Sequence, residues 1–248
     1  MVNLMSNKPK VLIITEGKKT EPKLYRKAFE LFPLFNKYEI YSYKANAYDL
    51  YGYLEPYWKD GSLEDSEFLQ ILQEHENSEE KKKVLEQNFS DVFLVFDFDP
   101  HDNRYDFAKL KRLLIYFNES TESGKLYINY PMVESYKHFL SMNDETYMDR
   151  LVRFEDLTSY KRIVARESRI GNVGDFTRDT FRMIVNGNLH KLYYLCLDER
   201  TLSDAVKIDD LLTYVAEKQN TFITQAQYCY VLNTGLLFLP QFSSKWDE

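Results

Sequence analysis

The stretch Val92-Phe-Leu-Val-Phe-Asp97-Phe-Asp99-Pro100 is an apolar run that ends in two aspartates. A second apolar run, Val11-Leu-Ile-Ile-Thr15, ends in Glu16-Gly17. Short apolar runs bounded by polar residues indicate strands that are buried on both faces, as in a parallel sheet. In an open parallel sheet the ligand crevice lies at the carboxyl ends of the strands. The sequence therefore predicts an α/β fold in which Glu16, Asp97 and Asp99 meet at one edge of the sheet.

These three carboxylates form a candidate metal site. In an extended chain the spacing of Asp97 and Asp99 directs both side chains to the same side and turns Phe98 into the core. Neighbouring carboxylates repel one another unless a cation neutralises them, and Mg²⁺ prefers oxygen ligands. We therefore expect Glu16, Asp97 and Asp99 to bind Mg²⁺ or Mn²⁺, with either one or two ions. Asp102 is either an additional ligand or the cap of the helix that follows.

Three motifs, taken in order along residues 9–142, resemble the TOPRIM domain of topoisomerases, primases and OLD-type and RloB-type nucleases, and the RloB-like branch in particular. The first motif is Thr15-Glu16-Gly17-Lys18-Lys19-Thr20-Glu21-Pro22, and the second is Asp97-Phe98-Asp99. The third is Asn129-Tyr130-Pro131-Met132-Val133-Glu134-Ser135-Tyr136-Lys137-His138-Phe139. The chain departs from the family pattern at Phe98, where Arg is common, and at Tyr130, which separates the Asn and the Pro.

The resemblance implies a metal-dependent nuclease that hydrolyses phosphodiester bonds in DNA, tRNA or other RNA. It gives Glu16 the role of metal ligand or general acid/base and Glu134 a place in a second metal site. The alternative for Glu134 is a carboxylate that stabilises a helix N-terminus. Lys18 and Lys19 would either stabilise the negative charge that develops on the phosphate or form a solvated turn.

The resemblance also implies a cellular role. RloB-like and OLD-type proteins are effectors of prokaryotic antiphage defence and are often paired with an ABC-type ATPase. The chain contains no Walker A motif, so the resemblance implies a toxic effector that is regulated by a partner ATPase.

Histidines and arginines supply further candidates. His101 follows Asp99 by two residues and could carry a proton. His138 lies four residues after Glu134 on a predicted helix, so the two would share a face. Arg162, Arg166 and Arg169 have the spacing of one helical face. We predict that this face borders the carboxylate cleft and contacts phosphates; a solvated helix is the alternative.

Composition narrows the classes of protein. The chain has 248 residues, of which 44% are apolar and 29% charged, as is typical of a globular protein. Its net charge of −7 argues against a protein that coats nucleic acid, but not against a nuclease with local basic patches. It has 20 tyrosines and 17 phenylalanines; most should pack internally, and some exposed tyrosines could stack on bases. The two cysteines have apolar neighbours, and no apolar stretch is long enough to span a membrane, so we expect a cytoplasmic protein without membrane association.

The patterns along the chain predict two regions. Residues 9–142 alternate strand and helix, as in a TOPRIM-like Rossmannoid parallel sheet with helices on both faces. We expect strands at 10–15, 38–44, 91–96 and 125–129, and helices at 21–35, 47–58, 105–117 and 133–142. Residues 46–90 form a helical insertion with a polar helix at 65–87. Residues 143–248 are predicted to be α-helical, with helices at 159–168, 175–190, 203–219 and 221–232.

Two other functions remain as alternatives. A haloacid-dehalogenase-like phosphatase also begins with a strand and Asp-x-Asp, although Pro100-His101 fits that family poorly. A catalytically inactive TOPRIM domain could serve as a binding subunit, although the retention of Glu16, Asp97 and Asp99 argues against it.

Overall fold

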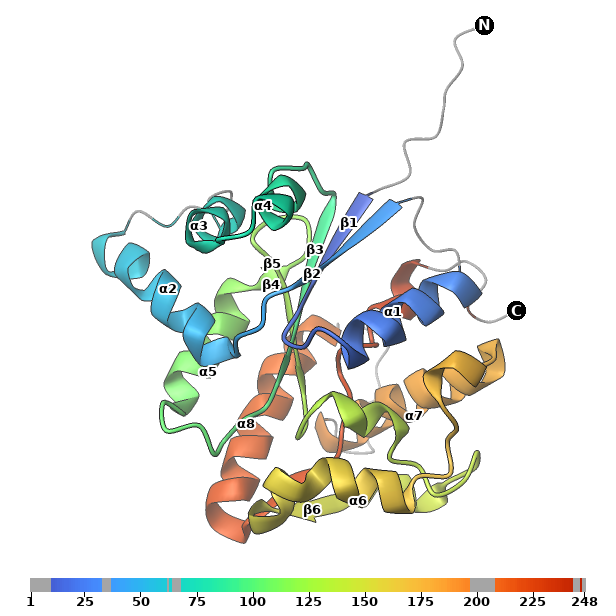
Figure 1. Ribbon diagram of the computed structural model, residues 1–248. Coiled ribbons are helices and arrows are strands. Elements are labelled where there is room, and N and C mark those ends of the chain that lie inside the picture. The colour runs from blue at the N-terminus through green and yellow to red at the C-terminus, as the bar shows by residue number, and fades with distance from the viewer. Residues whose placement is uncertain are drawn as a thin grey trace, which may run out of the picture.

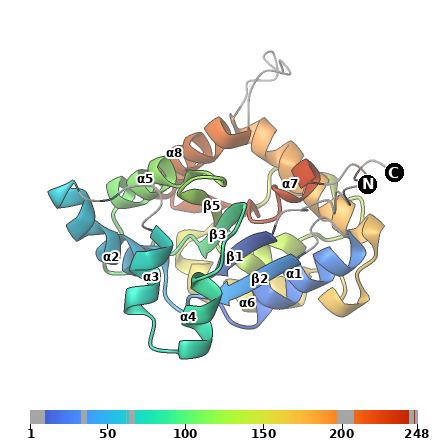
Figure 2. The same ribbon diagram turned by 90° about the horizontal axis from the view of Figure 1, so that it is seen from above.

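The computed structural model describes residues 10–32, 37–61, 63, 68–196, 208–242 and 246. Its centre is a five-stranded sheet with the strand order β2-β1-β3-β5-β4. The strands are β1 (Lys10–Thr15), β2 (Lys37–Ser42), β3 (Asp91–Asp97), β4 (Asn118–Glu119) and β5 (Gly124–Asn129). All neighbouring pairs are parallel except β4 with β5 at the edge. Helices cover both faces, so the predicted α/β fold is confirmed (Figures 1 and 2).

Two groups of α-helices flank the sheet. On one side lie α2 (Ala47–Asp60), α3 (Phe68–His75), α4 (Glu79–Leu85) and α5 (Phe107–Tyr116), and on the other lie α1 (Thr20–Leu31) and α7 (Arg178–Cys196) (Figures 1 and 2). The helix α8 (Ile208–Ala226) packs against both α5 and α7, and α6 (Tyr160–Glu167) lies beyond the carboxyl ends of β1 and β3 (Figure 1). A separate pair, β6 (Leu151–Arg153) with β7 (Tyr228–Tyr230), is antiparallel. Short 3₁₀ helices connect these elements: η2 (Val133–Lys137), η3 (Glu145–Tyr147), η4 (Phe154–Ser159), η5 (Val173–Asp175) and η6 (Leu239–Phe242).

The sheet is buried on both faces, which explains why its strands read as continuous apolar runs. In β3 every residue from Val92 to Phe96 is buried. The chain after β7 returns to the sheet, where the ring of Phe238 stacks on Phe93 at a centroid distance of 4.3 Å. The strands therefore hold the polar residues that follow them in fixed positions at one edge.

The polar helix predicted at 65–87 is wrong as a single element, because the described part of that range holds two helices, α3 and α4. The break lies at Glu76, whose carboxylate accepts hydrogen bonds from the backbone N–H groups of Asn77 and Ser78 and from the hydroxyl of Tyr41. These bonds fix the turn that separates the end of α3 from Ser78, the residue that precedes α4.

The helix predicted at 133–142 is also wrong, because the chain forms only the short 3₁₀ helix η2. The carbonyl of Lys137 accepts from the Ser168 hydroxyl and that of His138 from the Arg150 guanidinium. These carbonyls bond to distant side chains, and the helix ends there.

Two further expectations for the C-terminal region differ from the structure. The break expected between 219 and 221 is absent, since α8 continues to Ala226, while residues 203–207 lie outside the described residues. The helix expected at 221–232 gives way to β7, whose Cys229 is fully buried. Pairing with β6 thus overrides the helical pattern of the last residues. In the described part of the chain, no helix combines the length and the apolar character that crossing a bilayer requires.

Gly235 lies so close to the side chains of the core that a larger residue would not fit without a shift. A Cβ atom at this position would lie 2.7 Å from Val95 Cγ1 and 2.9 Å from the hydroxyl of Tyr25. We expect Gly235→Ala to lower the free energy of unfolding by about 1–3 kcal/mol through overpacking. In Gly52→Ala the added Cβ meets no atom within 4 Å on α2, so this control should gain about 0.5–1 kcal/mol from helix propensity. Urea unfolding of both variants measures the change in the free energy of unfolding. An unchanged value in Gly235→Ala would contradict this account.

Candidate functional site

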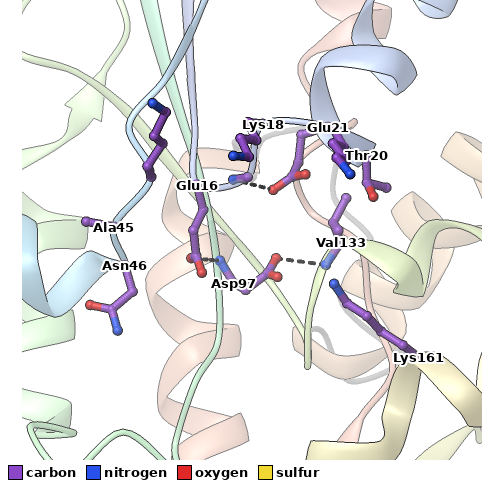
Figure 3. A pocket seen from close by; sticks show the side chains of 12 residues that line it. Glu16, Lys18, Thr20, Glu21, Ala45, Asn46, Asp97, Val133 and Lys161 are labelled. Atoms are coloured by element: carbon purple, nitrogen blue, oxygen red, sulfur yellow. Dashed lines mark hydrogen bonds between the residues drawn. The ribbon is translucent and has the colours of Figure 1, made fainter. Parts of the chain in front are cut away.

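A pocket of about 570 Å³ opens at the carboxyl ends of β1 and β3 (Figure 3). Five segments surround it: the turn after β1 with the start of α1, the loop after β2, the end of β3, the start of η2 and the helix α6. Its lining residues are Glu16, Gly17, Lys18, Lys19, Thr20, Glu21, Lys44, Ala45, Asn46, Asp97, Val133 and Lys161.

The turn after β1 places Glu16. The Thr15 hydroxyl donates to the carbonyl of Gly17, and the N–H of Gly17 donates to Glu21 Oε1 at 2.8 Å. A Cβ atom on residue 17 would lie 2.6 Å from Glu21 Oε2, so a larger residue here would require this buried carboxylate to shift. Glu21 is thus a second carboxylate of the site, which the strand-end argument did not identify.

Asp97 lies opposite Glu16 at the end of β3. Glu16 Oε2 accepts a hydrogen bond from the backbone N–H of Asp97 at 3.1 Å, and Asp97 Oδ1 accepts one from the N–H of Val133 at 2.7 Å (Figure 3). These two bonds join the ends of β1 and β3 to the segment that follows β5. The neighbouring strands thus bring Glu16 and Asp97 together at the edge where the sequence predicts them.

Asp99 lies in an adjoining pocket of about 240 Å³. This smaller pocket shares Glu16, Asp97 and Lys161 with the first. Phe98 points into the core and is 2% exposed, as the alternation of an extended chain predicts. The remaining residues that line the smaller pocket are Phe98, Asp99, Pro100, His101, Pro131, Met132, Leu157 and Thr158.

The carboxylates of the site repel one another in a poorly solvated place. Burial raises the pKa of Glu16 to about 7, and the charges of Glu21 and Asp99 add to this effect. Burial likewise raises the pKa of Asp97 well above its ordinary value, with further contributions from Glu16, Glu21 and Glu134. The site therefore favours either bound protons or a bound cation.

Lys161 is the cation of α6 that faces these carboxylates (Figure 3). Its Nζ lies 3.2 Å from Glu134 Oε1, and it lines both pockets. Partial burial lowers its pKa, but the charges of Glu134, Asp97 and Glu21 outweigh this, so the pKa lies above the ordinary value. Glu134 is 8% exposed, and its Oε2 is buried without a hydrogen-bond partner.

A metal ion is implied by the resemblance, and the donor set partly fits one. Among the described residues, no three His, Cys, Asp or Glu side chains are arranged as a metal-binding group. One oxygen each of Glu16 and Asp97 accepts a backbone N–H instead. However, the chemistry suits a hard cation. The donors are all carboxylate oxygens, burial and neighbouring carboxylates raise the pKa values of Glu16 and Asp97, and Glu134 Oε2 lacks a hydrogen-bond partner.

Lys18 and Lys19 line the larger pocket and are exposed, as either of their expected roles requires. Asp102 does not cap the helix that follows. Its carboxylate accepts hydrogen bonds from Arg104 and Asn46, which lower its pKa below the ordinary value, and the helix α5 is capped by Asp106 instead. Asp102 joins the loop after β3 to the start of α2.

The two candidate histidines lie apart. His101 is exposed, lines the smaller pocket, and its Nε2 lies 2.9 Å from the carbonyl of Phe154. His138 is buried between the hydroxyl of Tyr160 and the carboxylate of Glu167, and burial lowers its pKa. The shared face expected for His138 and Glu134 is wrong, because a 3₁₀ helix with three residues per turn separates positions four apart by roughly 120°.

The arginines of the C-terminal region are placed differently from the prediction. The helix α6 ends at Glu167, so Arg169 lies beyond it and cannot share a helical face with Arg162 and Arg166. All three are exposed, and none of them lines either carboxylate pocket. The predicted shared helical face is therefore wrong, while the contact of these arginines with phosphates stays a prediction.

The burial pattern of α6 explains this error. Tyr160 and Val164 form its buried face, which leaves Lys161 at the border of that face toward the site. Sequence reasoning did not single out Lys161. The apolar residues Tyr160 and Val164, four positions apart, could have indicated which face of α6 is buried and so which basic residue lies next to it.

In comparisons with known proteins, no family model matches the chain, and no curated protein or solved structure matches it either.

The raised pKa of Glu16 predicts a pH-dependent stability. Between its unfolded value of 4.5 and its folded value of about 7, the folded protein holds a proton that the unfolded chain has released. The free energy of unfolding of the metal-free protein should therefore fall as pH rises through this range, by on the order of 1–3 kcal/mol from this group. Urea unfolding in EDTA at pH 4.5 and pH 7.5 should show a smaller fall for Glu16→Gln than for the wild type. Equal falls would show that Glu16 is not buried among like charges.

Proposed function

We propose that the chain is a TOPRIM-type nuclease that hydrolyses phosphodiester bonds with Mg²⁺ or Mn²⁺. The observation that carries this proposal is the meeting of Glu16 and Asp97 at the carboxyl edge of a parallel sheet, with Asp99 in the adjoining pocket. Open parallel sheets bind their ligands at this edge. The order of the sequence motifs gives independent support.

The residues of the site divide into two sets. Glu16, Asp97 and Asp99 would hold the cation, which when bound lowers the pKa of a water and binds oxygens of the scissile phosphate. Lys18, Lys19, Lys44 and Lys161 line the pocket and supply the positive charge that a phosphate requires. Glu134 pairs with Lys161 and so holds its ammonium group toward the carboxylates.

The cellular role is proposed on the motif resemblance alone. The protein would act in the cytoplasm as a toxic effector of antiphage defence, with nucleic acid as substrate and an ABC-type ATPase as the regulating partner.

The test of the proposed function is cleavage by the purified protein. We expect nicking of plasmid DNA or cleavage of tRNA in Mg²⁺ or Mn²⁺, alone or with an ATPase encoded beside it, and none in EDTA. Bis-p-nitrophenyl phosphate, a diester, should be hydrolysed in preference to the monoester p-nitrophenyl phosphate. Preference for the monoester would favour the phosphatase alternative, and a lack of any cleavage with the partner present would favour the binding subunit.

A further inference from the structure

A third pocket, of about 330 Å³, lies at the junction of β6, η4 and β7. Arg153 and Tyr228 are partners across the β6–β7 ladder, and the next N–H, that of Phe154, donates to the carbonyl of Gln227. The lining residues are Arg153, Phe154, Glu155, Gln227 and Tyr228. The ladder and its extension therefore fix the backbone around this pocket.

The pocket combines aromatic surface with a rigid amide. The rings of Phe154 and Tyr228 are half-buried, which leaves part of each open to the pocket. Gln227 is exposed, and its Nε2 donates to the carbonyl of Ile223 at 2.9 Å, which orients the amide. Its backbone φ is +58°, the left-handed conformation that commonly follows the last residue of a helix, here α8, so the helix end fixes its position.

These groups suit a nucleobase. A base has two π-faces that stack on aromatic side chains, and polar edges that pair with amides and charged groups. Arg153 and Glu155, which pair with each other at 3.3 Å, place both kinds of charged group at the edge of the pocket. In a duplex the faces are stacked and the edges are paired, so a base enters such a pocket only when it is unpaired or extruded.

The pocket also lies close to the proposed reaction site. Phe154 begins the 3₁₀ helix η4, and Leu157 and Thr158 of the same helix line the smaller carboxylate pocket. At about 2 Å of rise per residue, Phe154 and Thr158 are roughly 8 Å apart along the helix. His101 joins the two places, since it lines the smaller pocket and its ring lies 4.1 Å from that of Phe154.

This separation fits a single strand. Stacked nucleotides rise about 3.4 Å each along one strand, so roughly 8 Å corresponds to about two steps. We propose that the pocket lined by Phe154, Gln227 and Tyr228 binds an unpaired base of the nucleic acid whose backbone lies at the carboxylate site. The inference rests on the proposed nuclease function and gives it a substrate class, single-stranded nucleic acid.

The test measures stacking directly. A short single-stranded oligonucleotide that carries 2-aminopurine should lose fluorescence when it binds the wild-type protein in EDTA, because stacking on an aromatic ring quenches this base. Phe154→Leu/Tyr228→Leu keeps apolar bulk at both positions; it should remove the quenching and weaken binding roughly tenfold to a hundredfold, the range expected for the loss of base stacking. Unchanged quenching and affinity in a variant with wild-type circular dichroism would overturn the proposal.

Two further measurements separate this proposal from the nuclease assignment. Tyr214 is an exposed tyrosine on α8, 14 positions before Tyr228. The control variant Tyr214→Leu should bind the oligonucleotide and quench 2-aminopurine as the wild type does. Asp97→Asn should still quench 2-aminopurine, because the base pocket does not contain Asp97. If quenching depends on the two rings while no substrate is cleaved, only the nuclease assignment fails. If the protein cleaves duplex and single strand equally and the double variant is fully active, only the base pocket fails.

Discussion

Replacing Asp97 by Asn is expected to abolish cleavage and to leave the fold intact. Asn keeps a side-chain oxygen that can accept the Val133 N–H, so the bond between the end of β3 and the segment after β5 survives. The substitution removes a charge from a site where Asp97 and Glu16 already repel one another. Loss of a ligand removes stabilisation from the attacking or leaving oxygen of the phosphate, so the rate should fall by several powers of ten.

The same substitution should stabilise the metal-free protein. Burial and like charges raise the pKa of Asp97, so a neutral amide avoids the free energy needed to hold the carboxylate there. Thermal unfolding in EDTA at pH 7.5 should show a higher midpoint for Asp97→Asn than for the wild type. The cleavage rates of Asp97→Asn and the wild type are compared by plasmid nicking and tRNA cleavage with equal amounts of folded protein.

Asp102→Asn is the matched control for Asp97→Asn, since it removes a carboxylate three residues beyond Asp99 in the loop after β3. Asp102 bonds to Arg104 and Asn46 and lines neither carboxylate pocket. We expect this variant to lose stability but to retain most of its activity per folded molecule. Full activity in Asp97→Asn, or equal losses in both variants, would contradict the assignment of the site.

The strand-end residues could be predicted because their placement depends only on local rules. Val92 to Phe96 is apolar without interruption, which indicates a central strand, and a parallel sheet brings the residues after such strands to one edge. Glu16 and Asp97 follow directly from this reasoning. Their closeness also requires that β1 and β3 are neighbours, which the observed strand order supplies and the sequence pattern did not specify.

The other parts of the site depend on contacts between distant segments, and these left little signal in the sequence. The 3₁₀ helix η2 ends where Ser168 and Arg150 bond to its carbonyls, and neither partner is near in sequence. Arg169 has helical spacing from Arg162, but α6 ends before it. Periodicity defines which positions can share a face, whereas the packing of Tyr160 and Val164 decides which face turns inward.

Because of this packing, we expect substitution of Lys161 to cause the second large loss of cleavage activity. Lys161 is the α6 residue common to both pockets, and its Nζ lies 3.2 Å from Glu134 Oε1, close to Asp97 (Figure 3). A fixed cation at this place would stabilise the charge that develops on a phosphate without reorganisation of solvent. Removing one such group in other enzymes costs about 10²–10³ in rate. We therefore expect Lys161→Met, which keeps an unbranched side chain only one atom shorter, to lose roughly that much activity.

Two companion variants show whether the loss in Lys161→Met is electrostatic. Lys161→Met leaves the buried Glu134 without its cation, so part of its effect could be a loss of stability. Lys161→Met/Glu134→Gln removes this penalty, and it should recover stability but not activity if the ammonium group acts on the phosphate. Arg162→Met removes the adjacent exposed charge on α6, which lines neither pocket, and should stay within about twofold of the wild type. Activity that returns with stability in the double variant would mean that Lys161 acts only by neutralising Glu134. Equal losses in Lys161→Met and Arg162→Met would mean that the net charge of α6, rather than the position of one ammonium group, governs binding of the substrate.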